Sequence, residues 1–346
     1  MAPRRFLIWM HSLDVPQWSI PAASVERIRA ALGPGWEVTA LEIPMRASGD
    51  GAASAPVSVL EEIAKAEVFC GFGVPRDVFL AGRRLRWVHS AAAGVRASLF
   101  DKMRDSEVRF TNSGGIYAEP MADHALAMIL YFARGLDVAV AAGASHEWAH
   151  AELAGHGNPL IEISGQVLGV LGYGRTGSAL GRRANALGMR VRAIRRTLGG
   201  LPPPPELEHL EGPEGLTDLL AGSDFVALTL PETAQTRQLL GAQQLALMKP
   251  GAVLINLSRG SLLDEDALIQ ALTERRLRGA ALDVFRHEPL PADHPFWGLD
   301  NVLVTPHVSG TSGLFWQRET DLIVRNISLY LAGEGLENEV DKERGY

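Results

Sequence analysis

The chain has 346 residues, of which 47% are hydrophobic and 21% are charged, with 36 glycines and 20 prolines. This length and composition are typical of a two-domain α/β enzyme and exclude a disordered or fibrous chain. The formal net charge of -7 at pH 7 argues against a nucleic-acid or anionic-membrane partner, because such partners bind basic surfaces.

The sequence indicates neither an export signal nor a membrane span. The opening MAPRRFLIWMH has no long apolar stretch, and the apolar run at 125–133 is too short to cross a bilayer. The single cysteine, Cys70, excludes an intramolecular disulfide and a thiolate metal cluster. We therefore expect a cytoplasmic protein without a metal site.

The first third of the chain alternates short apolar runs with helical patterns, as a parallel sheet covered by helices does. The segments of this series are 6–10, 25–32, 36–41, 57–66, 68–72 and 85–90. A long helix is expected next at 118–134, because its acidic residues come early and its arginine comes late. We interpret this helix as a connector between domains.

A second alternation of strands and helices begins at Val167. Its segments are a strand and turn at 167–174, a helix at 176–187, strands at 190–194 and 225–230, a helix at 243–247, a strand at 252–257, a helix at 264–274, and strands at 280–284 and 302–305. A last helical pattern at 318–331 is expected to pack on the first domain. The proline-rich stretch 198–215 is predicted to be a loop, because proline removes backbone donors. The pattern predicts two doubly wound parallel-sheet α/β domains with a cleft between them.

A glycine-rich turn follows the apolar strand VLGVL and precedes an amphipathic helix. Its residues Gly172, Gly174 and Gly177 fit the pattern G-x-G-x-x-G. In this context the three glycines permit a tight turn, a close approach of the backbone to a pyrophosphate, and close packing of helix on strand. The turn therefore predicts dinucleotide binding, and a glycine-bearing turn in another α/β protein is the alternative.

The end of the next strand bears on the choice of dinucleotide. NAD-selective sites usually carry an acidic residue there for the ribose 2′-hydroxyl, but this strand ends in Arg195, Arg196 and Thr197. Guanidinium groups suit the oxygens of a 2′-phosphate. We expect NADP(H) to be preferred, while NAD(H) use through other contacts stays possible if the two arginines are merely solvated.

Three later segments each place one reactive residue after an apolar strand. They are INLSRG with Arg259, LDVFRHEPLP with Glu288, and VTPHVSG with His307. Strand ends at one edge of a doubly wound sheet are where its ligands bind, so these side chains can converge. Reduction of a 2-oxo acid needs a cation for the substrate, a proton donor, and a partner that keeps the donor charged and oriented. Arginine, histidine and glutamate meet these needs as a set, although each alone is more often an ordinary structural residue.

The ordered set of motifs resembles the D-isomer-specific 2-hydroxyacid dehydrogenase family, and within it the glyoxylate and hydroxypyruvate reductase branch. The resemblance covers nearly the whole chain, through LRWVHSAAAGV, AEPMADHALAMIL, VLGVLGYGRTG, PGAVLINLSRG, ALDVFRHEPLP and VTPHVSG. It implies a flavodoxin-like substrate domain of residues 1–116 plus 310–346 and a Rossmann nucleotide-binding domain of residues 117–309.

The resemblance also implies roles for individual residues. Arg259 is expected to bind the substrate, His307 to act as the acid-base group, and Glu288 to be its partner. The backbone amides of Ala93 and Gly94 are expected to hold the substrate carboxylate. The expected cofactor contacts are Gly172, Gly174, Arg175, Thr176, Gly177, Arg195, Arg196, Thr197, Leu230, Pro231 and, toward the nicotinamide carboxamide, Asp283.

Two features depart from the family pattern or stand outside it. Arg96 replaces a frequent aspartate, and it is either an exposed loop residue or a contact for an acidic substrate group. His146, Trp148, His150 and His156 lie between the connector helix and the next strand, with spacing that fits no standard metal site. The family often builds a dimer arm in this region, so we expect Trp148 to pack in a homodimer interface.

Two other functions stay open from the sequence. One is NAD-linked oxidation of a D-2-hydroxy acid, as in phosphoglycerate dehydrogenases, although Arg195 argues against it. The other is a dinucleotide-sensing corepressor or scaffold that keeps the fold and the three reactive residues without turnover. The favoured function is NADPH-dependent reduction of a small 2-oxo acid such as glyoxylate or hydroxypyruvate.

Overall fold

The chain folds into two compact units. The structure is a computed structural model, and it describes residues 3–13, 15–45, 47–48, 51–52, 54–155, 160–199 and 202–345. Unit 1 comprises Met1–Tyr117 and Ser312–Tyr346, and unit 2 comprises Ala118–Thr311. These limits differ from the expected domain boundaries by one residue at the first crossing and by two at the second.

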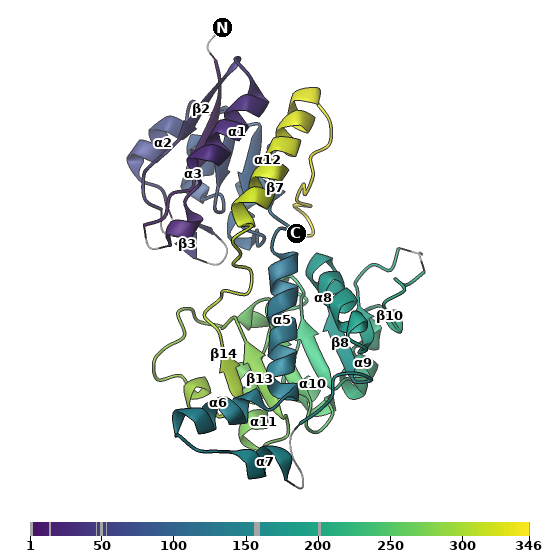
Figure 1. The fold of residues 1–346 in the computed structure, drawn as a ribbon. Helices are drawn as coiled ribbons and strands as arrows, with labels where there is room; N and C mark the ends of the chain where they lie inside the picture. The colour runs from purple at the N-terminus through teal and green to yellow at the C-terminus, as the bar shows by residue number, and fades with distance from the viewer. Residues whose placement is uncertain are drawn as a thin grey trace. The chain divides into compact units, whose positions relative to one another are not determined.

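Unit 1 is built on a five-stranded parallel sheet with the strand order β2-β1-β5-β6-β7 (Figure 1). The strands are β1 (Arg4–Trp9), β2 (Trp36–Ala40), β5 (Val68–Gly71), β6 (Trp87–Ser90) and β7 (Arg109–Asn112). The helices are α1 (Ala22–Leu32), α2 (Val57–Ile63), α3 (Arg76–Ala81), α4 (Asp101–Arg104) and α12 (Phe315–Ala332). A small antiparallel hairpin joins β3 (Ala47–Ser48) to β4 (Gly51–Ala52).

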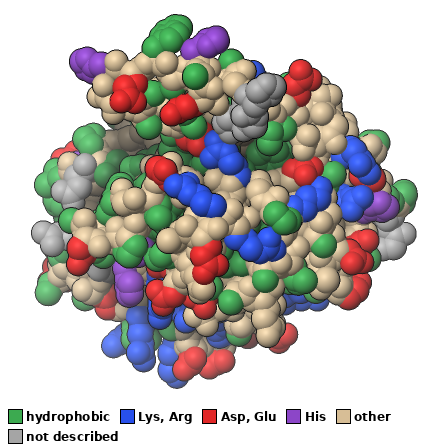
Figure 2. All heavy atoms as spheres, turned by 90° about the horizontal axis from the view of Figure 1, so that it is seen from below, with side chains coloured by type: hydrophobic (Ala, Val, Ile, Leu, Met, Phe, Trp, Pro, Cys, Tyr) green, Lys and Arg blue, Asp and Glu red, His purple; other side chains and the backbone are tan. Residues whose placement is uncertain are grey.

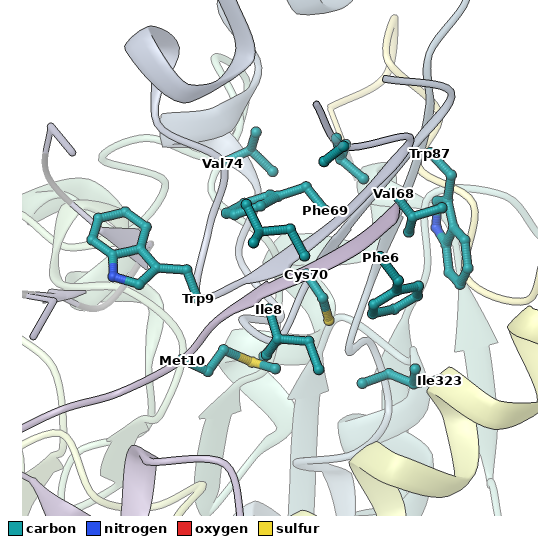
Figure 3. Close-up of a cluster of buried hydrophobic side chains, with 14 of the residues drawn as sticks. Phe6, Ile8, Trp9, Met10, Val68, Phe69, Cys70, Val74, Trp87 and Ile323 are labelled. Atoms are coloured by element: carbon teal, nitrogen blue, oxygen red, sulfur yellow. The ribbon is translucent and has the colours of Figure 1, made fainter. Parts of the chain in front are cut away.

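The core of unit 1 joins the first and last parts of the chain. Every residue of β5 and β6 is buried, so helices cover both faces of this sheet. Helix α1 packs against α12, and α2 packs against α3. Ile323 of α12 therefore belongs to the same hydrophobic cluster as Phe6, Cys70 and Trp87 of the strands (Figure 3). The predicted packing of the last helix on the first domain is confirmed.

Unit 2 is built on a seven-stranded parallel sheet with the order β10-β9-β8-β11-β12-β13-β14. The strands are β8 (Val167–Leu171), β9 (Arg190–Ile194), β10 (His209–Glu211), β11 (Phe225–Leu228), β12 (Val253–Asn256), β13 (Gly279–Leu282) and β14 (Val302–Val304). The helices are α5 (Ala118–Ala133), α6 (Leu136–Ala144), α7 (His150–Ala154), α8 (Arg175–Ala186), α9 (Leu216–Gly222), α10 (Ala242–Leu247) and α11 (Glu265–Thr273).

The two faces of the unit 2 sheet carry separate cores. Phe225 and Ala227 of β11 belong to one cluster with α5 and α8, whereas Val226 and Leu228 belong to another with α9, α10 and α11. This alternation follows from the two-residue period of a strand, and it explains why the strands are apolar on both faces. The prediction of two doubly wound parallel sheets is confirmed.

The strand order of unit 2 reverses direction between β8 and β11. From β8 the chain runs outward through β9 to β10, and it then returns to β11 and continues through β12 and β13 to β14. Such a reversal marks the ligand-binding crevice of an open parallel sheet, at the carboxyl ends of the strands. The residues that follow each strand of unit 2 are therefore the first to consider as a site.

The prediction of a continuous loop at 198–215 is wrong in part. Residues 209–211 form β10, which pairs with β9 at the edge of the sheet, His209 opposite Arg192. The prolines at 202–205 end before this strand, so they take no donor from it. Strand β10 has only three residues and pairs with one neighbour, β9. So short a strand leaves no apolar pattern that stands out in a proline-rich segment.

Several short elements were not predicted at all. Strand β7 has four residues at the edge of the sheet, and its sequence RFTN contains a single apolar residue, Phe110. Helix α6 has the alanine-rich sequence LDVAVAAGA, in which only Asp137 and Ala142 are buried, so the sequence shows no clear apolar stripe. Short edge strands and partly exposed helices leave a weak periodicity, and their formation depends on the neighbouring elements.

The chain has similar numbers of basic and acidic residues, 33 and 40, and both kinds lie on its surface (Figure 2). On the face drawn in Figure 2, acidic and basic side chains are intermixed. Among the described residues no single helix has the length and apolar composition needed to cross a membrane. The pair α5 and α6 meets that test only when joined across a bend of 74°. Helix α5 buries its apolar face in the unit 2 core.

Candidate active site

His307 and Glu288 form a close pair in unit 2. His307 comes three residues after β14, and its Nδ1 lies 2.7 Å from Oε2 of Glu288. The backbone N–H of Phe285 donates to the other oxygen, Oε1, at 2.9 Å, which fixes the carboxylate. Both side chains are about one-third exposed, at 31% and 32%. Because Nδ1 faces Glu288, Nε2 is the ring nitrogen that can act on a substrate.

The Glu288 carboxyl is held in its ionised form. Burial raises its pKa, but the hydrogen bonds from His307 and the Phe285 amide, together with the charges of His307 and Arg259, lower it. The net result is a pKa below the ordinary value of 4.5. An ionised carboxylate accepts the Nδ1 proton of its histidine partner and so orients the ring.

The segment that carries His307 is anchored by Asp283, which is fully buried directly after β13. Its Oδ1 accepts from the Thr305 hydroxyl at 2.6 Å and from the Val308 N–H at 2.9 Å, and its Oδ2 accepts from the Ser309 N–H at 2.9 Å. The His307 N–H donates to the Asp283 carbonyl oxygen at 2.9 Å. These bonds hold His307 in the left-handed region, with φ at 53°. This anchoring role was not predicted from the sequence, and the contact of Asp283 with a nicotinamide stays a prediction.

Arg259 follows β12 and is half-buried. Asn256, at the end of the strand, donates to the Arg259 carbonyl oxygen at 2.9 Å and accepts from the Ser258 N–H at 3.0 Å. A Cβ on Gly260 would lie 2.0 Å from the carbonyl carbon of Phe285, so only glycine allows this close approach. The Arg259 segment is therefore packed directly on the segment that leads to Glu288.

The glycine-rich turn has the geometry that the sequence predicts. Gly172 has a φ of 103°, and a Cβ there would lie 2.8 Å from the Leu230 backbone nitrogen. A Cβ on Gly177 would lie 2.4 Å from the Gly172 carbonyl oxygen. A Cβ on Gly174 would meet no described atom within 4 Å. The first and third glycines are thus required by the packing of the protein itself, whereas the second borders open space at the start of α8.

This open space fits a dinucleotide pyrophosphate. Gly174 and Arg175 are exposed and Thr176 is half-buried at the N-terminus of α8, where backbone N–H groups and the helix dipole attract phosphate. Leu230 is half-buried and packs near Gly172, while Pro231 is exposed. The residues present therefore suit the phosphate and adenosine parts of a dinucleotide.

The arginines after β9 lie at the same edge of the sheet. Arg195, Arg196 and Thr197 are all exposed. The Arg195 N–H donates to the Glu211 carbonyl oxygen of β10 at 2.9 Å, so the edge strand missed in the sequence positions the start of this segment. None of these three residues is acidic.

The segment after β6 in unit 1 presents backbone amides. Ala93 is exposed and Gly94 is half-buried. No described residue accepts a hydrogen bond from the N–H of Ala93, Gly94 or Val95. Three consecutive amides without an acceptor can bind an anion. The sequence indicated the first two, and Val95 is an addition from the structure. Arg96, exposed, begins the short 3-10 helix that follows.

The histidines near α6 and α7 do not form a metal centre among the described residues. His146 and His150 are exposed, Trp148 is 91% exposed, and His156 lies outside the described residues.

Known proteins with similar sequences support a dinucleotide-binding fold for unit 2. The family model described as the NAD-binding domain of D-isomer specific 2-hydroxyacid dehydrogenases matches residues 126–309. The chain is 35% identical over 276 residues to a glyoxylate reductase of Pyrococcus furiosus, covering 78% of this chain and 80% of the relative.

Solved structures align with the residues of both units. A D-isomer specific 2-hydroxyacid dehydrogenase from Xanthobacter autotrophicus, in complex with NADPH and MES, is 31% identical, with a TM-score of 0.79 and coverage of 98% of this chain and 99% of that one. An NADPH-dependent glyoxylate/hydroxypyruvate reductase from Sinorhizobium meliloti, in complex with NADP and sulfate, is 25% identical, with a TM-score of 0.78 and coverage of 99% and 100%. The chain belongs to the D-isomer specific 2-hydroxyacid dehydrogenase family, whose members are NAD(P)-dependent oxidoreductases.

Proposed function

We propose that this enzyme reduces a small 2-oxo acid, such as glyoxylate or hydroxypyruvate, to the D-2-hydroxy acid with NADPH. The observation that carries the proposal is the 2.7 Å contact between His307 and Glu288, at the sheet edge that also holds Arg259 and the glycine-rich turn. The names of the reductases to which the chain is similar support the substrate class.

Each residue has a defined task in this proposal. The Arg259 guanidinium and the amides of Ala93 and Gly94 bind the substrate carboxylate, and Arg259 also polarises the carbonyl group. NADPH, when bound, would supply the hydride for the carbonyl carbon. His307 donates the proton on Nε2 to the carbonyl oxygen, so that hydride and proton together convert C=O to CH–OH. Glu288 stabilises the imidazolium before this transfer and orients the ring afterward.

We propose NADP(H) as the preferred cofactor, held by Arg195, Arg196 and Thr197 around the 2′-phosphate. The exposed position of these residues after β9 and the lack of an acidic residue among them support this preference. NADPH and NADP in two similar structures also favour it. In the same proposal Arg175 and Thr176 contact the pyrophosphate, Leu230 and Pro231 line the adenosine, and Asp283 accepts from the carboxamide.

We further propose a cytoplasmic homodimer. Leu136 and Val140 are 45% and 62% exposed on α6, one helical turn apart, and Trp148 follows with 91% exposure. Apolar side chains grouped in this way are typical of a protein–protein interface. Use of a reduced dinucleotide and the single, buried Cys70 fit a reducing compartment.

The test is an assay of NADPH oxidation with glyoxylate, hydroxypyruvate, pyruvate and larger 2-oxo acids. We expect turnover with the smaller acids and slower turnover with NADH. Tight NADPH binding without turnover of any acid would instead support a dinucleotide sensor. Efficient oxidation of D-2-hydroxy acids with NAD, and no reduction with NADPH, would support the phosphoglycerate dehydrogenase type of function.

A further inference from the structure

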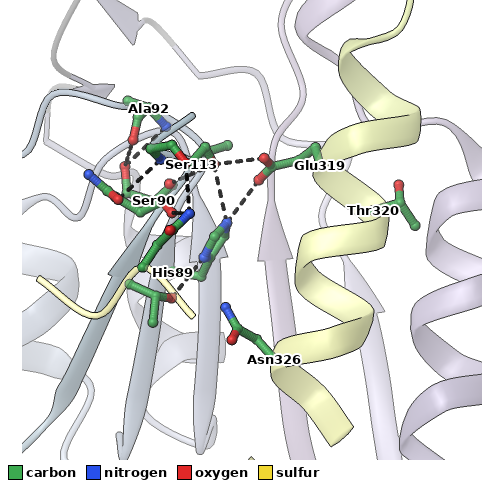
Figure 4. Close-up of polar contacts among 12 residues, drawn as sticks. His89, Ser90, Ala92, Ser113, Glu319, Thr320 and Asn326 are labelled. Carbon is green, nitrogen blue, oxygen red and sulfur yellow. Dashed lines mark hydrogen bonds and ion pairs between the residues drawn. The ribbon is translucent and has the colours of Figure 1, made fainter. Parts of the chain in front are cut away.

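Unit 1 contains a fully buried pair of titratable side chains that the proposed mechanism does not use. Nε2 of His89, on β6, lies 2.8 Å from Oε1 of Glu319, on α12, and both side chains have 0% exposure. Ser113, just after β7, donates its hydroxyl to Oε2 of Glu319 at 2.7 Å. Figure 4 shows these three residues meeting between the sheet and the last helix. We refer to His89, Glu319 and Ser113 as the buried triad.

The neighbours of His89 define its hydrogen bonding. The indole Nε1 of Trp87 can only donate, and it does so to Oγ1 of Thr111 at 2.9 Å. The Thr111 hydroxyl lies 2.8 Å from Nδ1 of His89 and can donate its own proton there. Nε2 then carries the ring proton and donates it to Glu319. In this arrangement the side-chain protons of Trp87, Thr111 and His89 each have an acceptor, and the Glu319 carboxylate receives hydrogen bonds from His89 and Ser113, as a buried carboxylate requires.

The buried triad adjoins the segment that presents the free amides. The Ser113 N–H donates to the Ser90 carbonyl oxygen at 3.0 Å, and its hydroxyl lies 3.1 Å from the same oxygen. The next residues of the segment are held in the same way. Tyr117 donates to the Ala91 carbonyl oxygen at 2.5 Å, and Asn112 donates to that of Ala93 at 2.7 Å.

These bonds determine which backbone groups stay available. The carbonyl oxygens of Ser90, Ala91 and Ala93 accept hydrogen bonds from residues 112–117, on the side of the buried triad. The N–H groups of Ala93, Gly94 and Val95 have no acceptor among the described residues. Burial, and secondly the Glu319 charge, raise the pKa of Tyr117, so its phenol keeps the proton that it donates to Ala91. The carbonyl groups thus hold the segment at 90–95 in place, and the N–H groups at 93–95 remain available to a ligand.

We propose that His89, Glu319 and Ser113 are positioning residues that fix the amides of Ala93, Gly94 and Val95 for the carboxylate of the 2-oxo acid. This inference rests on the proposed function. Ser113 connects the pair to the segment at 90–95, because its side chain donates to Glu319 while its backbone N–H donates to Ser90. Loss of the triad would leave His307 and Glu288 unchanged and would loosen the amides, so it would weaken substrate binding more than the chemical step.

The test compares two variants with a matched control on the same helix. Ser113→Ala removes only the hydroxyl, and Glu319→Gln keeps the shape of the side chain but removes its charge. The control, Thr320→Val, removes a buried hydroxyl that bonds to Ser24 at 2.8 Å. Thr320 points away from the buried triad on α12 (Figure 4). Ser113→Ala and Thr320→Val each remove a buried hydroxyl, and Glu319→Gln removes a buried charge, but only the changes at Ser113 and Glu319 affect the bonds that lead to the segment at 90–95.

We expect both triad variants to raise KM for glyoxylate about tenfold, equivalent to about 1.4 kcal/mol, with kcat and the Kd for NADPH changed less than about twofold. Hydrogen exchange of the amides at 93–95 should be faster in both variants than in the wild type. Thr320→Val should lower Tm without either effect. Wild-type KM and wild-type exchange in Ser113→Ala would overturn the proposal.

The exchange measurement also separates this proposal from the proposed function. If the wild type turns over no 2-oxo acid, the proposed function fails, and unchanged exchange at 93–95 in the folded variants still overturns the positioning role. If Glu319→Gln does not fold, Ser113→Ala decides alone, because it leaves the His89–Glu319 pair in place.

Discussion

His307 Nδ1 and Glu288 Oε2 lie 2.7 Å apart, although the two residues are separated by β14 and by the loop that precedes it. Asp283 fixes the histidine side of this pair through the segment at 305–309, and the Phe285 N–H fixes the glutamate side. The pair is therefore held from both ends before any ligand binds, as catalytic groups require.

Replacement of His307, the proposed proton donor, should strongly reduce turnover and spare cofactor binding. His307→Ala removes Nε2, and we expect kcat to fall by about 10²–10⁴-fold, the usual contribution of a general acid-base group. The Kd for NADPH should change less than about threefold. Steady-state kinetics and fluorescence titration measure the two effects. His287→Ala, in the exposed residue next to Glu288, is the matched control and should keep wild-type kcat; equal losses in both variants would contradict the assignment.

Glu288→Gln should reveal the ion pair through its pH dependence. The pKa of Glu288 in the folded protein lies below its ordinary value of 4.5, so the pair stabilises the protein fully above that pH and is lost as the pH falls through the lower folded value. The wild type should therefore exceed the variant in free energy of unfolding at about pH 6, and the difference should shrink below about pH 4. Urea unfolding at each pH measures it. A difference that grows on acidification would contradict the pair.

The three glycines of the turn should separate into structural and binding positions. Gly177→Ala places a Cβ 2.4 Å from the Gly172 carbonyl oxygen, and we expect a loss of about 1–3 kcal/mol in the free energy of unfolding. Gly174→Ala meets no described atom, so Tm should be unchanged while NADPH binding weakens about tenfold or more. Thermal unfolding and fluorescence titration test both variants. Tight NADPH binding by Gly174→Ala would place the pyrophosphate elsewhere.

Arg195→Asp should reverse the cofactor preference. The substitution removes a cation from the proposed 2′-phosphate site and adds the carboxylate that suits a ribose 2′-hydroxyl. We expect kcat/KM for NADPH to fall about 10- to 100-fold, the range of one charge-assisted hydrogen bond, with a smaller change for NADH. Arg190→Ser, in the exposed arginine at the start of β9, is the control and should leave the ratio of the two cofactors unchanged. A uniform loss for both cofactors in Arg195→Asp would contradict the role in selectivity.

The exposed face of α6 should control the oligomeric state. Val140→Asp places a charge beside Leu136, and we expect it to shift the proposed dimer toward the monomer in light scattering after size exclusion. Leu80→Asp changes a residue that is 51% exposed on α3 and should leave the mass unchanged. A monomeric wild type would remove the dimer, and an unaffected dimer in Val140→Asp would move its interface elsewhere.

The sequence predicted that Arg259 and His307 follow strands, but it missed several of the short elements around them. Arg259 and His307 each follow an apolar strand, and parallel strands bring such positions to one edge, so their convergence was predictable. Asp283 was visible as a motif residue, but its anchoring of the segment at 305–309 depends on backbone geometry that side-chain type does not encode. The His89–Glu319 pair joins residues 230 positions apart, and only the packing of α12 on the sheet brings them together.

The elements that were missed share a physical cause. Strands β7 and β10 have only four and three residues and lie at sheet edges, so they are too short to show a periodic apolar pattern. Their effect on the site is nevertheless direct. Strand β10 holds the Arg195 backbone, and the residues after β7 hold the carbonyl groups of the segment at 90–93. The pattern of apolar residues along the sequence indicates strands that are buried on both faces. It does not indicate short strands whose formation depends on neighbouring segments.

The division of unit 1 between the two ends of the chain sets an order for biosynthesis. The cores of unit 2 draw only on its own continuous segment, whereas the core of unit 1 needs Phe315, Ile323 and Ile327 of α12. At about 5–20 residues per second, a ribosome takes roughly 10–40 s to pass from the end of the first segment to this helix. The nucleotide-binding unit can therefore fold first. Until α12 is synthesised, the apolar side chains of unit 1 that pack on it, such as Trp87 and Cys70, lack this cover. A chaperone that binds exposed apolar strands can bind unit 1 during that interval.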